Sequence, residues 1–298
     1  MQRLFAILIL LLAACTSSNT ASPSTTRSTT QSTTPNSQHP GRGNPSAGVP
    51  HFAHIVVVIE ENHSYRDVVG SGQAPYFTAL ARSGALLTNS YGVAHPSEPN
   101  YLALFSGSTH GLTDDSCPLR YHADNLAAQL RSRGMSFVGY AESLPAPGYR
   151  GCAAGGYARK HAPWTDFADV PARVGQPMSA FPTDFGQLPR VAFVVPNLDH
   201  DMHDGTVGQA DQWLRAHLGG YASWARDHDS LLIVTWDEDD FSAANHIPGL
   251  LVGAHVRRMR YRGRVDHYTV LRTIEAAERL PTVGATAYRT PITAVWMP

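Results

Sequence analysis

Four short apolar runs limit how this chain can fold more than any other feature. They are HIVVVI at 54–59, SFVGY at 136–140, VAFVV at 191–195 and LLIVTW at 231–236. Runs of this kind indicate strands buried on both faces, as in a parallel sheet. Helical patterns lie between or after them at 124–133, 210–226 and 267–280. The alternation predicts an α/β fold, a three-layer sandwich with a central, mostly parallel sheet covered by helices on both faces.

The first 15 residues have the layout of a secretory signal. Arg3 precedes an apolar run at 4–12, which is too short to span a bilayer, and Ala13, Ala14 and Cys15 follow. The string LAAC resembles the lipobox of bacterial lipoproteins, in which Cys15 becomes the lipidated N-terminus. An ordinary signal peptide cut nearby is the alternative. We therefore expect export, either to the extracellular face of the cell membrane as a lipid-anchored protein or as a secreted one.

Residues 16–50 are rich in Ser, Thr and Pro and contain few apolar side chains. Such a segment cannot bury enough surface to offset the entropy lost on ordering, so we expect a disordered linker. The remaining residues, 51–298, contain no repeat or second linker. Their length suits one large catalytic domain with a sizeable core.

Charge and cysteine content narrow the partners and the compartment. The formal net charge is -1, which gives no electrostatic reason to expect nucleic acid or an anionic bilayer as a partner. No obligate protein partner is evident either. Cys117 and Cys152 remain once Cys15 is assigned to lipid, and an even pair in an exported chain favours a disulfide. A two-cysteine metal site is a weak alternative, because neither has a second ligand at the usual spacing.

Acidic clusters follow two of the predicted strands. Glu61 and Asn62 come after the run at 54–59, and Asp237 and Glu238 come directly after the run at 231–236. Ligands of open α/β sheets bind beyond the carboxyl ends of the strands. If these strands are neighbours, the four side chains converge into an oxygen-rich site suited to a divalent cation. Solvated loop acids are the alternative.

Ser97 is the candidate nucleophile. It lies in the string HPSEPNY, where Pro99 suits the first turn of a helix that 101–105 would continue. Ser97 would then lie at the positive end of that helix, where backbone N–H groups bind phosphate. A plain helix cap is the alternative. The G-x-S-x-G string of serine esterases is absent, whereas a cation held by the acids above would activate the hydroxyl.

Several strings carry a family resemblance. VVVIEENHSY, HPSEPNYLALFSG, PNLDHDMHDG, VTWDEDD and DHYTVLRT, in this order, resemble those of the bacterial phosphoesterase family of acid phosphatases and phospholipases C. The likeness covers residues 52–298 and is greatest to secreted actinobacterial acid phosphatases. The resemblance implies the alkaline-phosphatase-like fold, with a central sheet between helices and a nucleophilic Ser or Thr beside metal.

The resemblance also implies roles for individual residues. Ser97 corresponds to the nucleophile and metal-bound hydroxyl, and Asn100 to an amide that donates to the phosphoryl oxygen. Glu98 replaces an aromatic of the related string, and the acidic pair is Asp-Glu where the larger family often has Asp-Asp. These departures leave the number and identity of the metals open among Mg, Ca, Mn, Zn and Fe. The implied metal ligands are Glu61, Asn62, Ser97, Asp237 and Glu238.

Histidines supply candidates for the acid that protonates the leaving group. His203 is favoured, within a His- and Asp-rich stretch at 197–204, and Asp201 and Asp204 are candidate ligands or orienting residues. His267, at the start of the last helix, is the next candidate. A hydrogen-bonded structural histidine is the alternative for each. Weaker candidates for the site wall are His95, Asn245 and His246.

These features predict an exported, metal-dependent phosphoesterase. The first expectation is an acid phosphatase that hydrolyses phosphate monoesters through a phosphoserine at Ser97. A phospholipase C that cleaves the phosphodiester of a lipid headgroup is the second, and a catalytically silent binding lipoprotein is the third. The expected partner is thus a phosphate ester, either a small molecule or a phospholipid headgroup.

Overall fold

The computed structural model describes residues 48–297, so the expected signal peptide and residues 16–47 of the expected linker lie outside the described residues. Within the described part, all four predicted strands are present and central. They are β1 (Ile55–Glu60), β4 (Phe137–Ala141), β8 (Val191–Val195) and β9 (Leu231–Trp236). Every residue of β1, β8 and β9 is buried, as expected for strands covered on both faces.

The main sheet has eight strands in the order β12-β2-β11-β9-β1-β8-β4-β7. The five from β9 to β7 run parallel, whereas β11 is antiparallel to β9 and to β2. The outer strands are β2 (Ala85–Leu87), β7 (Gly175–Pro177), β11 (Gly249–Gly253) and β12 (Met259–Tyr261). A three-stranded sheet comprises β3 (Ser90–Tyr91), β10 (His246–Ile247) and β13 (Val265–Asp266), and β5 (Ala153–Ala154) pairs with β6 (Tyr157–Ala158). The predicted mostly parallel sheet is confirmed.

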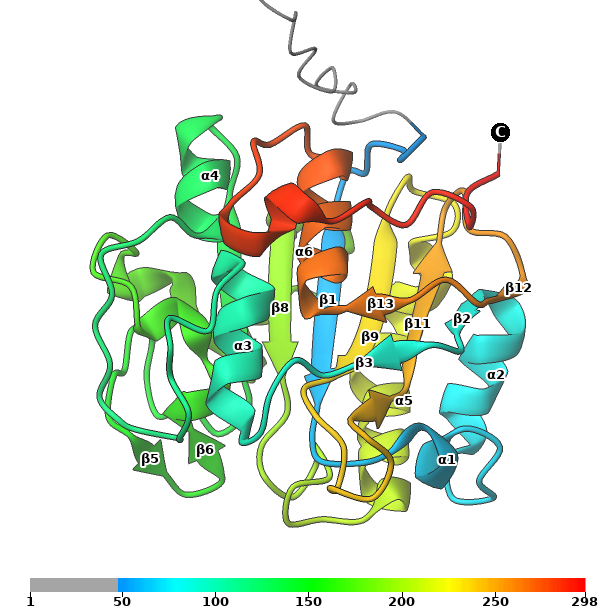
Figure 1. Cartoon of the computed structure of the whole chain (residues 1–298), viewed down its shortest axis with the longest axis horizontal. Coiled ribbons are helices and arrows are strands. Elements are labelled where there is room, and N and C mark those ends of the chain that lie inside the picture. Colours follow the sequence, from blue (N-terminus) through cyan, green and yellow to red (C-terminus); the bar gives the residue numbers. More distant parts are fainter. Residues whose placement is uncertain (1–47, 298) are drawn as a thin grey trace, which may run out of the picture. The chain divides into compact units, whose positions relative to one another are not determined.

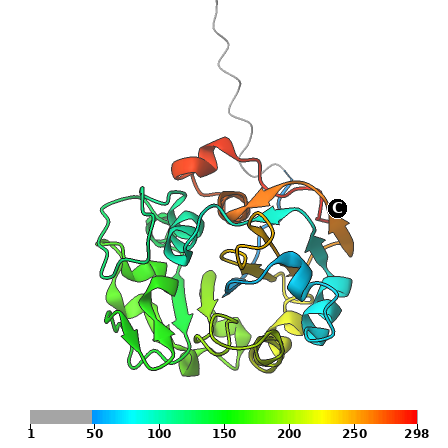
Figure 2. The ribbon, with the colours of Figure 1, turned by 60° about the horizontal axis from the view of Figure 1, so that its bottom comes forward.

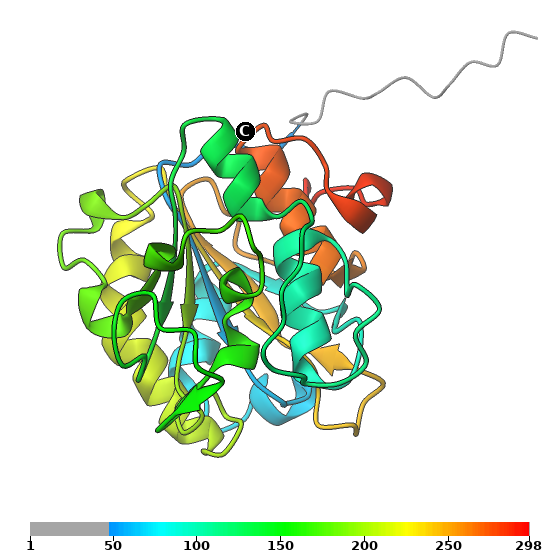
Figure 3. The ribbon, with the colours of Figure 1, turned by 90° about the vertical axis from the view of Figure 1, so that its left-hand side faces the viewer.

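Helices cover both faces of this sheet (Figures 1 and 3). Side chains of β1 alternate: Ile55, Val57 and Ile59 belong to one core, and Val56 and Val58 to the other. The first core packs against α3 (Ser97–Ser106), α4 (Leu126–Ser132) and α6 (His267–Ala277). The second packs against α2 (Pro75–Ser83) and α5 (Val207–Trp224), and the short α1 (Tyr65–Val68) follows β1. The three-layer sandwich is therefore confirmed.

The predicted disulfide is also confirmed. Cys117 and Cys152 are bonded, with their Cα atoms 5.8 Å apart. The bond joins the loop before α4 to the segment that leads, through β5 and β6, to the short 3-10 helix η1 (Arg159–His161). It thus ties two long irregular segments together on one side of the sheet. No helix among residues 48–297 is long and apolar enough to cross a bilayer.

The register of the central strands places the acidic clusters together. Glu60 of β1 pairs with Trp236 of β9, so Glu61 and Asp237 leave the same edge of the sheet from adjacent strands. Figure 2 shows the molecule with this end turned toward the viewer. The α3 helix begins beside the same edge (Figure 1).

Candidate active site

The predicted oxygen ligands converge at the carboxyl ends of β1 and β9. The Ser97 Oγ lies 3.1 Å from Glu61 Oε2 and 3.3 Å from Glu238 Oε1, so its one O–H can donate to either carboxylate. The backbone N–H of Asn62 donates to Asp237 Oδ1 at 3.3 Å. All of these residues except Asn62 are buried, with relative exposures of 2% or less. The structure therefore brings together all five residues of the predicted set.

Ser97 is positioned by its helix but does not cap it. It is the first residue of α3, Pro96 is the cap, and no side-chain capping bond forms. Its hydroxyl is therefore free to face the carboxylates. The helix start offers less to an anion than the sequence suggested, because the Glu98 N–H donates to Asp115 Oδ1 at 2.9 Å and Pro99 has no N–H.

Burial and like charges make this carboxylate cluster costly. Burial, followed by the charges of Asp237 and Asp201, raises the pKa of Glu61 well above its usual range. Burial and the neighbouring Glu238 raise the pKa of Asp237 in the same way. Oδ2 of Asp237 has no hydrogen-bond partner among the described residues. Such a cluster is stabilised either by protonation or by a bound cation.

The set of donor groups shows whether a cation fits here. One arm of the Asn62 side-chain amide lies 3.2 Å from Glu61 Oε2 and 3.1 Å from Glu238 Oε1. Oδ2 of Asp237 is buried beside them without a partner in residues 48–297. Carboxylate and amide oxygens are the ligands that hard divalent cations prefer. The side chains present therefore fit a hard divalent cation.

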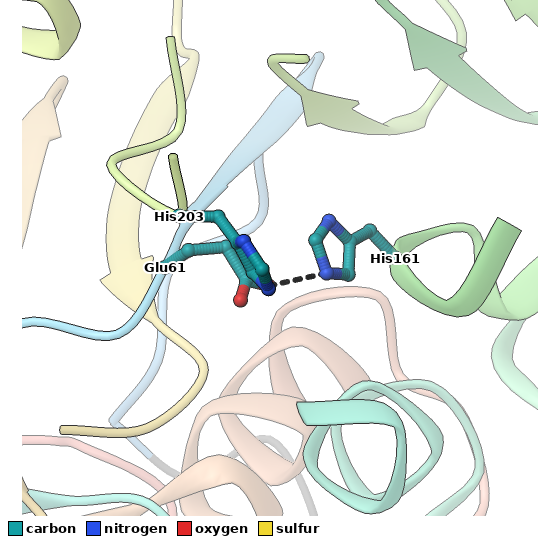
Figure 4. Close-up of side chains that lie close together, drawn as sticks. All are labelled: Glu61, His161 and His203. Atoms are coloured by element: carbon teal, nitrogen blue, oxygen red, sulfur yellow. Dashed lines mark ion pairs between the residues drawn. The ribbon is translucent and has the colours of Figure 1, made fainter. Parts of the chain in front are cut away.

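A second group of possible ligands shares Glu61 (Figure 4). Ligand atoms of Glu61, His161 and His203 lie within 4.8 Å of one another. His161 Nε2 is 3.1 Å from Glu61 Oε1, and its Nδ1 is 3.3 Å from Asp201 Oδ2. Burial lowers the pKa of His161 well below its usual range, so its imidazole is neutral, the form that binds metals. Tyr101 stacks on this ring and donates to Glu61 Oε1.

Lys160, beside His161, is the only lysine in the 298 residues. Its Nζ lies 2.8 Å from Asp115 Oδ2 and 3.3 Å from His203 Nε2. Burial lowers the pKa of Lys160, but the hydrogen bond to Asp115 and the charge of Glu61 outweigh burial and raise it. A fixed ammonium therefore stands beside the carboxylate cluster. Neither Lys160 nor His161 was among the sequence candidates, although a single lysine in a chain of this length is a signal.

The His- and Asp-rich stretch joins the site as expected. The backbone carbonyl of Asp201 accepts from the N–H of Glu61 at 2.7 Å, and its Oδ1 accepts from the N–H of His203 at 2.8 Å. Asp204 Oδ1 is 2.8 Å from His203 Nδ1. Both aspartates thus orient neighbouring site residues, and the His203 side chain keeps 26% of its surface exposed.

Asn100 and His267 have partners other than a phosphoryl group. The Asn100 amide accepts from the N–H groups of Val93 and Ala94 and donates to the carbonyls of Ala94 and Pro96, so it holds the loop before Ser97. His267 is buried, and its Nε2 bonds to the backbone carbonyl of Asp237. Both residues are therefore placed to position Ser97 or Asp237.

The weaker candidates for the site wall, His95, Asn245 and His246, differ in how they relate to the carboxylates. His95 lies at the site, because Nδ1 contacts Glu238 Oε2 and its ring stacks on Phe241 at 4.0 Å. Asn245 accepts from the N–H of Asp239 and donates to the carbonyl of Ala94, which braces two site loops. His246 stacks between Tyr65 and Tyr91.

This combination of sheet, helix layers and a serine hydroxyl among acidic side chains at the strand ends defines an alkaline-phosphatase-like hydrolase fold. The chain resembles a protein of the alkaline phosphatase superfamily from Vibrio parahaemolyticus, with a TM-score of 0.53 and 14% identity, covering 78% of this chain and 68% of that one. Identity this low shows the fold alone. The chain belongs to the phosphoesterase family, whose model matches residues 71–281.

Two curated relatives extend the comparison. The chain is 48% identical over 260 residues to the phosphatidylinositol-3-phosphatase of Mycobacterium tuberculosis, covering 86% of this chain and 87% of that protein. It is 30% identical over 246 residues to an acid phosphatase of Aspergillus fumigatus, covering 75% of this chain and about half, 54%, of the fungal enzyme. The chain is accordingly a hydrolase of phosphoric esters.

The carboxylate cluster makes a prediction about Asp237→Asn. In EDTA the variant should melt roughly 2–4 °C above the wild type, which corresponds to about 1 kcal/mol in a domain of this size, because the amide is neutral without the proton that the buried carboxyl must take up. Added Mn²⁺ should raise the melting temperature of the wild type but much less that of the variant. Calorimetric melting with and without the ion measures both effects.

Asp240→Asn, an exposed change three residues away, is the matched control and should leave both melting temperatures unchanged. Equal stabilisation of wild type and Asp237→Asn by Mn²⁺ would show that the ion binds elsewhere.

Proposed function

We propose that this protein is an exported, metal-dependent phosphatase that hydrolyses phosphate monoesters through a phosphoserine at Ser97. The observation that carries the proposal is the Ser97 hydroxyl, buried and within 3.3 Å of carboxylate oxygens of Glu61 and Glu238. A hydroxyl buried among carboxylates has no structural purpose as a helix cap, since no capping bond forms. It is placed to lose its proton and attack phosphorus.

The residues of the chain divide the chemistry among them. A divalent cation held by Glu61, Asn62, Asp237 and Glu238 would lower the pKa of the serine hydroxyl and offset the charge of the phosphoryl oxygens. Ser97 Oγ forms the bond to phosphorus as the bond to the leaving oxygen breaks. Hydrolysis of the phosphoserine by water then releases phosphate and restores the hydroxyl.

The surrounding bases and cations complete the site. The ammonium of Lys160 lies beside His203 and is placed to offset charge on the transferred phosphoryl group. His203 is partly exposed and held by Asp204, so it suits protonation of the leaving alkoxide. His161 is fully buried against Glu61, which favours a ligand or orienting role over proton exchange with solvent.

The relatives favour a monoester substrate. The relative at 48% identity is a phosphatidylinositol-3-phosphatase, and the fungal relative is an acid phosphatase. A phosphate monoester carried on an inositol lipid satisfies both the chemistry of the site and the expected anchor at Cys15. Export to the extracellular face agrees with the Cys117–Cys152 disulfide, which persists in oxidising compartments.

Ser97→Ala should lower kcat by roughly 10⁴-fold or more, as expected on loss of a nucleophile. Acid quenching of wild-type protein during turnover, followed by mass spectrometry, should locate phosphate on the Ser97 peptide. Ser106→Ala, at the other end of the same helix, should retain activity. A variant without Ser97 that keeps wild-type activity would refute the nucleophile.

Lys160→Met should lower kcat/KM for an aryl monoester by about 10²- to 10³-fold, the usual loss when one preorganised charge donor is removed. Lys160→Arg, which keeps the charge, should lose less. Because Lys160 is the sole lysine, amine acylation offers a second test: inorganic phosphate should protect both the label site and the activity. Unchanged kcat/KM in Lys160→Met would remove Lys160 from the phosphate site.

The products distinguish monoesterase from phospholipase C. Vesicles containing phosphatidylinositol 3-phosphate should release inorganic phosphate, and vesicles of phosphatidylcholine should release no diacylglycerol. Chromatography of the lipids and a phosphate assay measure the two products. Diacylglycerol as the main product would favour phospholipase C, and hydrolysis of neither ester with divalent cations present would favour the silent binding protein.

A further inference from the structure

A row of arginines lies outside the proposed active site. The segment RRMRYRGR at 257–264 contains five arginines and no acid, whereas the whole chain has a formal net charge of -1. The residues between the arginines are Met259, Tyr261 and Gly263. In an extended chain, alternate side chains point to opposite faces, so this pattern separates a basic face from an apolar one.

The structure uses both faces. Met259 and Tyr261 pack against the core from β12, the edge strand of the main sheet. All five arginines are exposed, and none forms an ion pair with another residue in 48–297. Positive charge is therefore concentrated along one edge of the main sheet. This edge lies beside α2 (Figure 1). The five arginines, Arg257, Arg258, Arg260, Arg262 and Arg264, are here called the edge row.

The direction of β12 brings the last part of the edge row toward the active-site end. β12 is parallel to β2, which is antiparallel to β11, and β11 is antiparallel to β9. β12 and β9 therefore run the same way. Arg262 and Arg264, which follow β12, lie toward the end of the sheet where Asp237 follows β9, whereas Arg257 and Arg258 precede the strand. The edge row thus runs along the sheet edge toward the reaction-site end.

A stack of aromatic rings lies between Arg260 and Arg264. Arg260 donates to the Tyr65 hydroxyl at 3.3 Å, and the Tyr65 ring stacks on His246 at 4.7 Å. His246 stacks in turn on Tyr91 at 5.1 Å, and the Arg264 guanidinium lies 4.2 Å above the Tyr91 ring. Tyrosine rings with an apolar body and a polar tip are favoured at a membrane–water boundary.

The same surface continues to the rim of the active site. Arg66, next to Tyr65, donates to the backbone carbonyl of Ser242 at 3.3 Å. The neighbouring Phe241 is 75% exposed, although its ring stacks on His95, which contacts Glu238. Because its ring is exposed and stacks on His95, Phe241 is placed to insert into the apolar layer of a membrane.

A hollow of about 410 Å³ lies beneath the edge row. Its floor is apolar, from residues such as Phe77 and Leu86, and its rim carries Arg82, Arg258 and Arg260. Guanidinium groups around an apolar floor match an anionic headgroup attached to hydrocarbon.

We propose that the edge row, the aromatic stack and Phe241 form a docking surface for an anionic phospholipid bilayer. Charge on an edge strand also prevents edge-to-edge association, but that purpose is served by either sign and needs no aromatic stack or hollow. Single-stranded nucleic acid would use basic residues as well. The exposed Phe241 and the apolar floor favour lipid. Docking here turns the carboxyl ends of the strands, and hence Ser97, toward the membrane.

Vesicle binding tests the proposal in the full chain carrying Cys15→Ser, which removes the acceptor of the expected anchor. The wild-type surface should bind phosphatidylcholine–phosphatidylserine vesicles more tightly than pure phosphatidylcholine vesicles, with a difference that shrinks as salt rises. Arg258→Gln/Arg260→Gln/Arg262→Gln should weaken binding to the anionic vesicles on the order of 100-fold. Hydrolysis of soluble para-nitrophenyl phosphate should stay unchanged, because these arginines lie outside the catalytic machinery.

A matched triple variant controls for net charge. Arg120→Gln/Arg133→Gln/Arg173→Gln removes three exposed arginines from other parts of the surface and should retain anionic vesicle binding. Phe241→Ser should reduce binding to both vesicle types by loss of insertion. The variant Arg258→Gln/Arg260→Gln/Arg262→Gln is here called the edge triple. If the edge triple binds vesicles as tightly as the wild type and its melting temperature is unchanged, the row only protects the sheet edge. A larger loss of oligonucleotide binding than of vesicle binding would assign the row to nucleic acid.

The binding measurement is independent of catalysis, whereas preference for a lipid-borne ester over a soluble one rests on the proposed function. If no ester is hydrolysed but the edge triple still loses vesicle binding, the phosphatase proposal falls and the docking surface stands. If hydrolysis of lipid and soluble esters falls equally in the edge triple, the docking surface falls instead.

Discussion

The burial of several carboxylates around one hydroxyl is the constraint on which the rest of the structure depends. Glu61, Asp237 and Glu238 meet at exposures of 2% or less, where burial and mutual repulsion both disfavour their charged forms. Only a rigid support can hold such a cluster. That support is the pairing of β1 with β9, whose six matched residues are all buried on both faces and fix where the next residue of each strand emerges.

Lys160 and His161, which lie beside the carboxylates, come from an irregular segment that is held in place by hydrogen bonds and a disulfide. Arg159 is buried and donates to Asp166, to Thr165 and to the carbonyls of Leu119 and Arg150, which fixes η1 at its first residue. The next two residues, Lys160 and His161, are thereby delivered to the carboxylates. The disulfide joins the neighbouring loop that carries Asp115, the partner of Lys160. Loops can carry function here because the bonds of Arg159 and the disulfide fix their course.

The sequence was informative where a periodic pattern or a strand end fixes position. The runs at 191–195 and 231–236 are strands with those bounds, and the acids following β1 and β9 converge because adjacent parallel strands end at one edge. Side chains on aperiodic loops were not predictable. His161 contacts Glu61, which lies 100 residues earlier in the chain. The Asn100 amide bonds to the backbone of the loop at 93–96. No local sequence pattern indicates either contact. The expected anion site of α3 is reduced because Asp115, 17 residues away, takes an N–H.

The net charge of the chain was a poor guide to its partners, because it does not show which charged side chains are buried and which are exposed. The formal value of -1 counts 24 acids against 23 bases. Among residues 48–297, however, twelve acids are buried and only two arginines are. Buried acids that are protonated, paired or neutralised by a cation contribute little to the field felt by an approaching partner. The surface that solvent sees is therefore more basic than the composition suggests, and the edge row concentrates that excess. The buried acids, of which Glu61, Asp237 and Glu238 belong to the candidate site, thus leave a positive excess on the outer surface that the net charge of the chain conceals.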